Sequence, residues 1–265
     1  MSGPAAHLAA VEAVVTTVRP AGNLDVVTLS VPDDDAWERG RPGQLVVLPR
    51  DPTFGRVLPE VHWLAGSHVD PIHGASIELM LPLERATEPG ERIRLLGPLG
   101  RGFAPPSQQV PVLLVGHEGG AVPLHWLVEI LRARGCTVHV LLGSSDPQLH
   151  VDLVHLRRHA RTVVLTLPED LSASLERMLD DPDIDPAVVY AGAPVTILRE
   201  IARAGVARGL AVRVAALDLD QPVVCGTGLC GACDLDVHDG RSSMVLRACL
   251  EGPVIPGDWL LGSMP

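Results

Sequence analysis

The segment Cys225–Cys249, with the sequence CGTGLCGACDLDVHDGRSSMVLRAC, contains four of the five cysteines in this chain of 265 residues. The first three follow the spacing C-x4-C-x2-C, and fifteen residues separate the third from the fourth; the four are Cys225, Cys230, Cys233 and Cys249. Glycines between the first three allow the backbone to adopt positive φ, to wrap tightly and to turn its N–H groups inward. Four thiols on such a segment predict a metal centre.

The spacing of these cysteines is that of plant-type [2Fe–2S] sites, in which three ligands share a loop and the fourth comes from a later strand. Between Cys233 and Cys249 the sequence predicts a β-hairpin with Asp239-Gly240 at its turn, which returns Cys249 to the loop. Structural zinc is the alternative, but zinc sites usually use two separate C-x2-C pairs and this chain has one. The spacing therefore favours the iron–sulfur cluster. The fifth cysteine, Cys136, lies between a predicted helix end and a predicted strand, which indicates a buried structural thiol.

The charge of the chain limits its partners. The net charge is −11, and the 21 basic residues, all arginine, form no cluster. Nucleic acids and anionic membrane surfaces attract clustered basic side chains, so neither is an expected partner. No apolar run approaches the roughly 20 residues of a membrane-spanning helix. The N-terminus has no basic segment before an apolar run, and the cysteines do not resemble a secreted disulfide framework, so we expect a cytoplasmic protein.

Upstream of the cysteines, the sequence changes character near Pro105 and Pro106. Before that point, short β-branched runs alternate with glycine, proline and aspartate, as in a small antiparallel barrel or sandwich. Beyond it, buried strands alternate with amphipathic helices, such as the one predicted over residues 122–135, which indicates a parallel α/β domain. The predicted fold class is α+β multidomain. It has an N-terminal antiparallel β-barrel (1–104), a central parallel α/β nucleotide-binding-like domain (105–217), and a C-terminal [2Fe–2S] loop and hairpin (218–265).

Over nearly its whole length the chain resembles the electron-transfer subunit of NAD-dependent dihydroorotate dehydrogenase, a branch of the ferredoxin–NADP reductase superfamily. Besides the cysteine loop, the matching segments are RPGQLVVLP (41–49), LLGPLGRGF (95–103), LLVGHEGGAVPL (113–124), VVYAGAP (188–194) and CLEGPVI (249–255). The resemblance implies that the barrel binds FAD and that the α/β domain receives NAD(H). It further implies that the cluster relays electrons to a flavin in a partner catalytic subunit, and that this chain is not catalytic alone.

The resemblance also implies flavin-site residues, together with departures from the family. In the family, an Arg-Pro-x-Ser/Thr segment holds the FAD pyrophosphate. Here GRVLPEVHW keeps Arg56 but has Leu58-Pro59 at the hydroxyl-bearing end. The family's aromatic-Arg-Val-Val strand and Gly-x-Gly-Thr turn have no counterpart in residues 77–91. The glycines expected beside the flavin are Gly97, Gly100 and Gly102.

The implied dinucleotide site departs from the family as well. The Gly-Gly-Gly-Ile-Gly loop of the family appears here as GHEGG, in which Gly116 and Gly120 remain. Glu118 brings negative charge toward a pyrophosphate that backbone N–H groups should bind. The family's Cys-Gly-Pro beside the nicotinamide is replaced by Gly192-Ala193-Pro194. We therefore expect weak or absent use of NAD(H).

Three functions remain open from the sequence. The first is an electron-transfer subunit with FAD and the cluster, acting in a hetero-oligomer with a separate catalytic oxidoreductase. The second is a flavin-free, ferredoxin-like relay in a larger redox complex, which the paired flavin-site and dinucleotide-site departures favour. The third is a non-redox interaction protein whose loop holds zinc, which the cysteine spacing disfavours. The apolar tail around Trp259 fits either docking of a partner or packing against the α/β domain.

Overall fold

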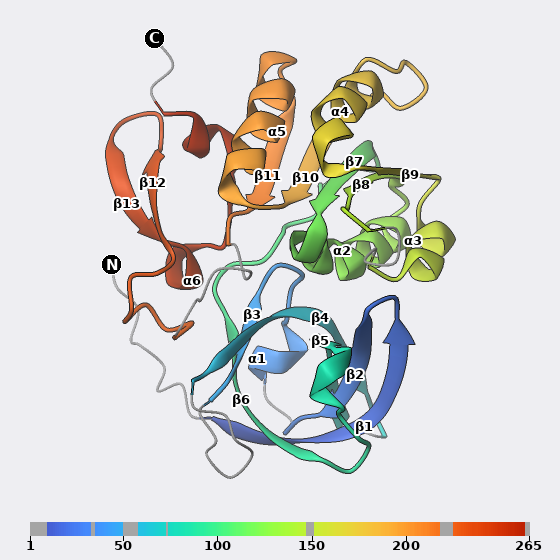
Figure 1. Ribbon diagram of the computed structural model, residues 1–265, viewed down its shortest axis with the longest axis vertical. Helices are drawn as coiled ribbons and strands as arrows, with labels where there is room; N and C mark the ends of the chain where they lie inside the picture. Colours follow the sequence, from blue (N-terminus) through green and yellow to red (C-terminus); the bar gives the residue numbers. More distant parts are fainter. Residues whose placement is uncertain are drawn as a thin grey trace.

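The computed structural model describes residues 10–32, 35–49, 58–72, 74–146, 151–217 and 225–262. Figure 1 shows a β-barrel at one end, an α/β sheet at the other, and the C-terminal hairpin beside the sheet. In the described part of the chain, no helix has the length and apolar character needed to cross a membrane.

Six strands close the N-terminal barrel, in the order β1-β2-β5-β4-β3-β6, and every neighbouring pair is antiparallel. They are β1 (Val11–Ala21), β2 (Leu24–Ser30), β3 (Leu45–Leu48), β4 (Glu60–Asp70), β5 (Gly74–Pro82) and β6 (Arg92–Leu99). Alternate side chains point inward from the strands, as period-two patterning requires, and fill the barrel with aliphatic groups such as Ile77 and Leu79. The short helix α1 (Asp35–Glu38) adds the buried Trp37 to this core. The predicted barrel is thus confirmed, with β4 as an additional strand.

The second layer of structure is a six-stranded sheet in the order β14-β11-β10-β7-β8-β9. Five strands are parallel: β7 (Pro111–His117), β8 (Thr137–Gly143), β9 (Thr162–Thr166), β10 (Val188–Gly192) and β11 (Ala211–Ala215). The antiparallel edge strand β14 (Val254–Pro256) comes from the C-terminal tail. The helices between the parallel strands are α2 (Val122–Ala133), α3 (Leu153–His159), α4 (Leu171–Leu179) and α5 (Val195–Ala207). Strand order reverses between β7 and β10, so their carboxyl ends form the topological switch point of the sheet.

Helix α2 shows why the sequence prediction for this region was correct. Its apolar residues recur at helical spacing and are buried, and its last turn is followed by Gly135 at φ 81°, where glycine is favoured. Cys136 begins the next segment and is 1% exposed, which confirms the prediction of a buried thiol.

The tail after residue 225 contributes to both halves of the molecule. It forms the hairpin strands β12 (Asp234–His238) and β13 (Ser243–Arg247), the one-turn helix α6 (Ala248–Glu251), β14 and the 3-10 helix η6 (Gly257–Leu261). Backbone hydrogen bonds join Arg101, at the end of the barrel, to Gly252 and Val254 of the tail. Ala216, after β11, donates to the Pro253 carbonyl over 2.8 Å. The segment between α6 and β14, residues 252–253, therefore lies between the barrel and the sheet, and we call it the seam.

Candidate functional site

The cysteine loop bends at three glycines. Gly226, Gly228 and Gly231 take φ values of 63°, 80° and 73°, which confirms the predicted positive φ. A Cβ atom at Gly226 would overlap Val47 of the barrel, and one at Gly228 would overlap Leu250 of α6. Only glycine allows this close approach. The loop is therefore held between the barrel and α6 in one path.

Backbone N–H groups of the loop point at the cysteine sulfurs, as the sequence predicted. The Cys225 sulfur accepts hydrogen bonds from the N–H groups of Thr227 (3.3 Å), Leu229 (3.2 Å) and Cys230 (3.4 Å). The N–H of Gly228 donates to the Cys249 sulfur over 3.1 Å. Such donors stabilise negative charge on thiolates.

Burial separates the outer thiols from the inner ones. Cys230 is exposed and Cys225 partly so, whereas Cys233 and Cys249 are buried. Burial would raise the pKa of Cys225, but the N–H donors of Thr227 and Cys230 outweigh it and lower that pKa to about 6. Burial, together with the neighbouring Cys233, raises the pKa of Cys249 to about 12. Because metals bind thiolates, loading this site releases a proton from Cys249.

The four thiols interact mainly within two pairs, and the charge of Cys225 also acts on Cys249. The Cys225 side chain interacts with that of Cys230, and the Cys249 side chain with that of Cys233. Among the residues that the structure describes, no three cysteine sulfurs lie within 4.8 Å of one another. A tetrahedral zinc ion, with Zn–S bonds of about 2.3 Å, requires four sulfurs about 3.8 Å apart. Two pairs instead suit two irons that each take two thiolates, so the residues present fit a [2Fe–2S] cluster.

The hairpin that leads to the fourth cysteine has Asp239-Gly240 in its turn, as predicted, and differs from the prediction in where Cys249 lies. Its turn is a four-residue loop, Asp239–Ser242, in which the Asp239 carboxylate accepts the N–H groups of Arg241 (2.9 Å) and Ser242 (2.8 Å). Cys249 lies on α6 rather than on a strand, because the chain turns into a helix immediately after β13. At the base of the hairpin, an ion pair of Arg247 with Asp234 (2.9 Å) joins the two strands.

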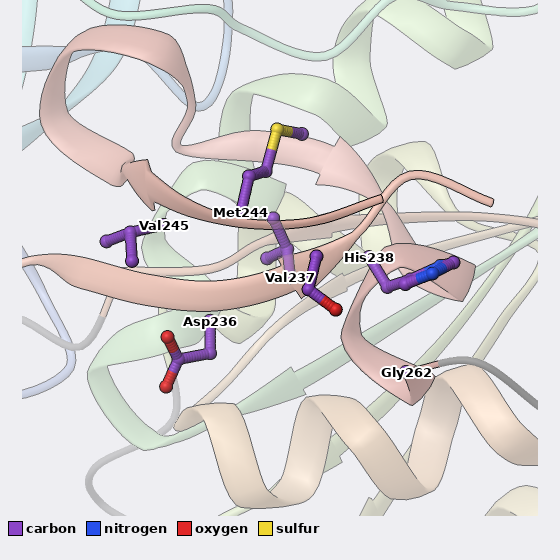
Figure 2. Close-up of a pocket in the computed structure, with 7 residues that line it drawn as sticks. Asp236, Val237, His238, Met244, Val245 and Gly262 are labelled. Atoms are coloured by element: carbon purple, nitrogen blue, oxygen red, sulfur yellow. The ribbon is translucent and has the colours of Figure 1, made fainter. Parts of the chain in front are cut away.

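The surface around the loop has apolar side chains. Leu229, next to Cys230, is 88% exposed, and Leu250 of α6 is also exposed. A separate open pocket of about 480 Å³ is lined by the turn half of the hairpin and by Gly262 (Figure 2). Met244 and Asp236 extend to opposite sides of the hairpin there. This pocket contains no cysteine. Trp259 of η6 packs partly buried against the main core, consistent with tail packing.

The glycines expected beside FAD are closely packed within the chain. Arg56 lies outside the described residues. A Cβ at Gly100 would lie 2.5 Å from the Gly252 carbonyl, and one at Gly102 would lie 2.7 Å from the Pro42 carbonyl. A Cβ at Gly97 would lie 3.0 Å from the Leu45 carbonyl. Packing within the chain is therefore sufficient to require glycine at Gly100 and Gly102.

The two glycines expected to bind a dinucleotide do lie at the switch point. Gly116 ends the buried part of β7 and pairs with Gly192 of β10. A Cβ at Gly116 would meet Ala121 at 2.7 Å and Leu142 at 2.8 Å, and one at Gly120 would meet the Ala193 nitrogen at 2.7 Å. The structure thus brings both glycines together, in close packing with neighbouring segments.

A buried polar cluster that the sequence did not reveal links the barrel to the α/β part. Asp152 pairs with Arg19 of β1 (2.8 Å) and with His125 of α2 (3.3 Å), and His155 bonds the His125 carbonyl (3.0 Å). Their ligand atoms are close enough for a metal ion, but the His125 and His155 rings are stacked at 3.8 Å. Because a metal lies in the plane of each imidazole ligand, stacked rings cannot share one. Arg19 already supplies the cation. No sequence motif marks this cluster, since its members come from distant segments.

Comparison with known proteins finds a domain that the cysteine segment is similar to. Residues 220–261 match the iron–sulfur cluster binding domain of dihydroorotate dehydrogenase B. This match includes all four clustered cysteines and the hairpin between them.

Curated relatives extend the similarity beyond that segment. The chain is 31% identical over 177 residues to the dihydroorotate dehydrogenase B (NAD(+)) electron transfer subunit of Desulforamulus reducens, covering 64% of this chain and 65% of the relative. It is 28% identical over 176 residues to the subunit of the same name from Shouchella clausii, covering 63% and 64%. The chain therefore spans slightly less than two thirds of the length of these relatives.

Solved structures share the whole architecture at low sequence identity. A chain of NADH-dependent reduced ferredoxin–NADP oxidoreductase superposes with a TM-score of 0.70 at 19% identity, covering 98% of this chain and 91% of that one. The flavohem-like FAD/NAD binding domain of nitric oxide dioxygenase from Vibrio cholerae O1 biovar El Tor superposes with a TM-score of 0.59 at 16% identity, covering 78% and 98%. These similarities establish the fold: barrel, α/β sheet and, in the first case, nearly the full chain.

Proposed function

We propose that this chain, which resembles the electron-transfer subunits of dihydroorotate dehydrogenase B, relays electrons through a [2Fe–2S] cluster to or from a partner oxidoreductase. The observation that carries the proposal is the cysteine loop, where four thiols interact mainly within two pairs and backbone N–H groups point at their sulfurs. The ligands are Cys225, Cys230, Cys233 and Cys249. When bound, the cluster supplies one-electron chemistry at a potential that hydrogen bonds to sulfur adjust.

The residues of the chain then have distinct roles. The N–H groups of Thr227, Gly228 and Leu229 stabilise thiolate charge and thereby favour the reduced, more negative state. Burial of Cys233 and Cys249 keeps water from the inner half of the site. The exposed loop around Leu229 and Cys230 leaves the outer half open to approach by another redox centre.

The partner in this proposal is a catalytic oxidoreductase subunit, because the relatives are named as electron transfer subunits of a dehydrogenase. We assign residues 1–104 to the barrel domain, 105–217 to the α/β domain and 218–265 to the cluster-binding tail. We place the protein in the cytoplasm, where thiols stay reduced, and all five cysteines are free.

FAD binding in the barrel is part of the first form of this proposal, with Arg56 and the Gly97–Gly102 segment as its remaining family residues. A second form, a flavin-free relay, is favoured by one observation. Gly100 and Gly102 are required by packing against the tail and against Arg41 and Pro42, so they are not by themselves a trace of a flavin site.

Anaerobic purification followed by an absorption spectrum and assays of iron, sulfide, zinc and released flavin tests the proposal. We expect about two irons and two sulfides per chain and bleaching of the visible bands by dithionite. Zinc in place of iron would refute the electron-transfer function. Released FAD, or uptake of added FAD that Arg56→Ala weakens, would establish the first form; flavin-free protein that takes up no FAD would establish the second.

A further inference from the structure

The switch point between β7 and β10 is where open α/β sheets of this type bind ligands. Three segments meet at this point: the 3-10 helix η3 (Glu118–Ala121) after β7, residues 144–145 after β8, and residues 193–194 after β10. In this chain they contact one another directly. These contacts occupy space that a dinucleotide would need, and they use hydrogen-bond donors that its phosphates would need.

The space is filled by backbone. Gly120 approaches β10 so closely that an added Cβ would lie 2.7 Å from the Gly192 carbonyl oxygen and 2.7 Å from the Ala193 nitrogen. In return, a Cβ on Gly192 would overlap the Gly120 carbonyl. Residue 192 must therefore be glycine as long as η3 keeps this position. A thiol-bearing side chain at Gly192 has no room.

The N-terminus of α2 offers no free donors in its first two residues. The N–H of Val122 bonds the Gly119 carbonyl, and Pro123 has none. Val122, Pro123 and Leu124 are also buried. A helix N-terminus binds phosphate through exposed N–H groups, and here the first two residues of the helix provide none.

Two further donors at this point are bonded to a carboxylate of the chain itself. Glu118 accepts the N–H of Ser145 over 2.8 Å and the hydroxyl of Ser144 over 3.1 Å. Burial would raise the pKa of Glu118, but these hydrogen bonds and His117 outweigh it, and the pKa is lowered. The backbone of Glu118 lies at φ 46°, a conformation that side-chain-bearing residues rarely adopt. The carboxylate is thus held as an anion at the carboxyl end of β8.

We infer that Glu118 is an internal anion in place of a dinucleotide phosphate, and that with the Gly120–Gly192 contact it closes the switch point to NAD(H) and NADP(H). The inference rests on the proposed electron-transfer function and excludes nicotinamide nucleotides as its electron donors or acceptors. The electrons that enter or leave this chain are then exchanged with the redox centre of another protein. Each transfer moves one electron, oxidising one centre as the other is reduced, with no hydride taken from a nicotinamide.

The test uses the purified, cluster-containing full chain under anaerobic conditions. We expect dithionite to bleach the cluster and millimolar NADH or NADPH to leave it oxidised, with no saturable binding of either nucleotide in calorimetry. Saturable binding, or bleaching by NADH, overturns the inference while leaving the electron-transfer function intact. Absence of any cluster that dithionite bleaches would instead refute the electron-transfer function.

Variants test the role of Glu118 itself, with inorganic pyrophosphate as the probe. Glu118→Gly removes the carboxylate, frees the Ser145 N–H and suits the positive φ. We expect it to bind pyrophosphate at least tenfold more tightly than wild type. The control Glu169→Gln also removes one negative charge, at an exposed position of the α/β part, and should bind pyrophosphate as wild type does. Equal binding by wild type and Glu118→Gly refutes the internal-anion role. If Glu118→Gly loses its cluster or its cooperative melting, Glu118→Gln replaces it and the same comparison decides.

Discussion

At the scale of single residues, the cysteine site is asymmetric. Cys225 accepts three backbone hydrogen bonds, which help to lower its pKa to about 6, whereas Cys249 is buried beside Cys233 and its pKa is raised to about 12. The first thiol is thus ready to bind iron near neutral pH, and the last must lose a proton in doing so. Individual side chains of this loop should therefore have separable effects on cluster assembly.

Replacing any one ligand with serine should remove most of the bound iron and the visible colour. The reason is that serine lacks the soft thiolate that iron–sulfur clusters use. Iron per chain and the visible spectrum, measured after anaerobic purification, check this for Cys230→Ser. Cys136→Ser is the control, because Cys136 is buried and is distant in sequence from the loop. This variant should contain as much iron as wild type. Equal iron in wild type and Cys230→Ser would contradict the assignment of ligands.

Iron binding should be more sensitive to alanine at Gly228 than to alanine at Gly240, a glycine of similar backbone conformation in the hairpin turn. Gly228 and Gly240 have φ of 80° and 86°, so alanine at either costs about 1 kcal/mol in backbone strain. Only at Gly228 does the added Cβ overlap a neighbour, Leu250. We expect Gly228→Ala to lose iron and Gly240→Ala to retain it. Comparable iron content in the two variants would show that the close approach to α6 is not needed.

At the scale of elements, the barrel and the α/β part are joined by an ion pair between a half-exposed arginine and a buried carboxylate. Asp152, before α3, is 6% exposed and bonds both Arg19 of β1 and His125 of α2. Its side chain N-caps α3, because the carboxylate accepts the N–H of His155 at 3.1 Å. One carboxylate therefore fixes a strand and two helices relative to one another.

Removing that carboxylate should destabilise the protein. We expect Asp152→Asn to lower the free energy of unfolding by about 2 kcal/mol, because a buried hydrogen-bonded partner is lost. A double-mutant cycle with Arg19→Ala should give a coupling of about 1 kcal/mol, since Arg19 is half exposed. Urea unfolding measures both values. Additive effects of the two changes would mean that the ion pair does not couple barrel and helices.

The same variant has a predictable pH dependence. Burial would raise the pKa of Asp152, but His125, Arg19 and the His155 N–H hold it well below its ordinary value of 3.8. A carboxyl with a depressed pKa stabilises the folded state above its unfolded pKa and loses that effect as the pH falls toward its folded value. The stability gap between wild type and Asp152→Asn should therefore stay constant from pH 8 to pH 5. A gap that shrinks within that range would contradict the depressed pKa.

At the scale of the whole molecule, the C-terminal tail holds barrel, sheet and cysteine loop together. Strand β14 pairs with β11, the Gly252–Val254 backbone pairs with Arg101, and Gly226 of the loop packs on Val47. The cysteines are therefore positioned by contacts with both preceding parts of the chain rather than by the loop alone.

A larger residue at Gly100, where the barrel contacts the seam, should detach the C-terminal tail from the barrel. Gly100 and Gly90 have φ of 74° and 91°, but only Gly100 has a neighbour, the Gly252 carbonyl, at the position of a Cβ. We expect Gly90→Ala to cost about 1 kcal/mol and Gly100→Ala about 1–2 kcal/mol more, with loss of iron and faster proteolysis of the tail. Melting, iron assay and limited proteolysis measure these effects. Full iron and unchanged proteolysis in Gly100→Ala would show that the seam does not position the cysteines.

The sequence alone was sufficient for features that depend on neighbours in the chain. Hydrophobic periodicity identified most barrel strands and α2, because strand and helix periods appear directly in the order of residues. The C-x4-C-x2-C spacing and its glycines predicted a loop that the structure confirms in backbone conformation and N–H direction. Strands β4, β11 and β14 were not predicted; β14 is only three residues long, and its pairing comes from the tail returning to the sheet edge.

Tertiary structure alone decided how distant segments meet. Glu118 is recognisable in sequence as a charge in a glycine-rich loop, but only the fold shows its carboxylate bonded to Ser144 and Ser145. From the sequence, Gly192 is recognisable only as a glycine in place of the family's cysteine. The fold shows that the Gly120 carbonyl leaves no space for a side chain at this position. The Arg19–Asp152 pair joins residues 133 positions apart. Such contacts depend on how strands are ordered in a sheet and how barrel and sheet pack, and the free energy of that packing is spread over the whole chain rather than over any local pattern.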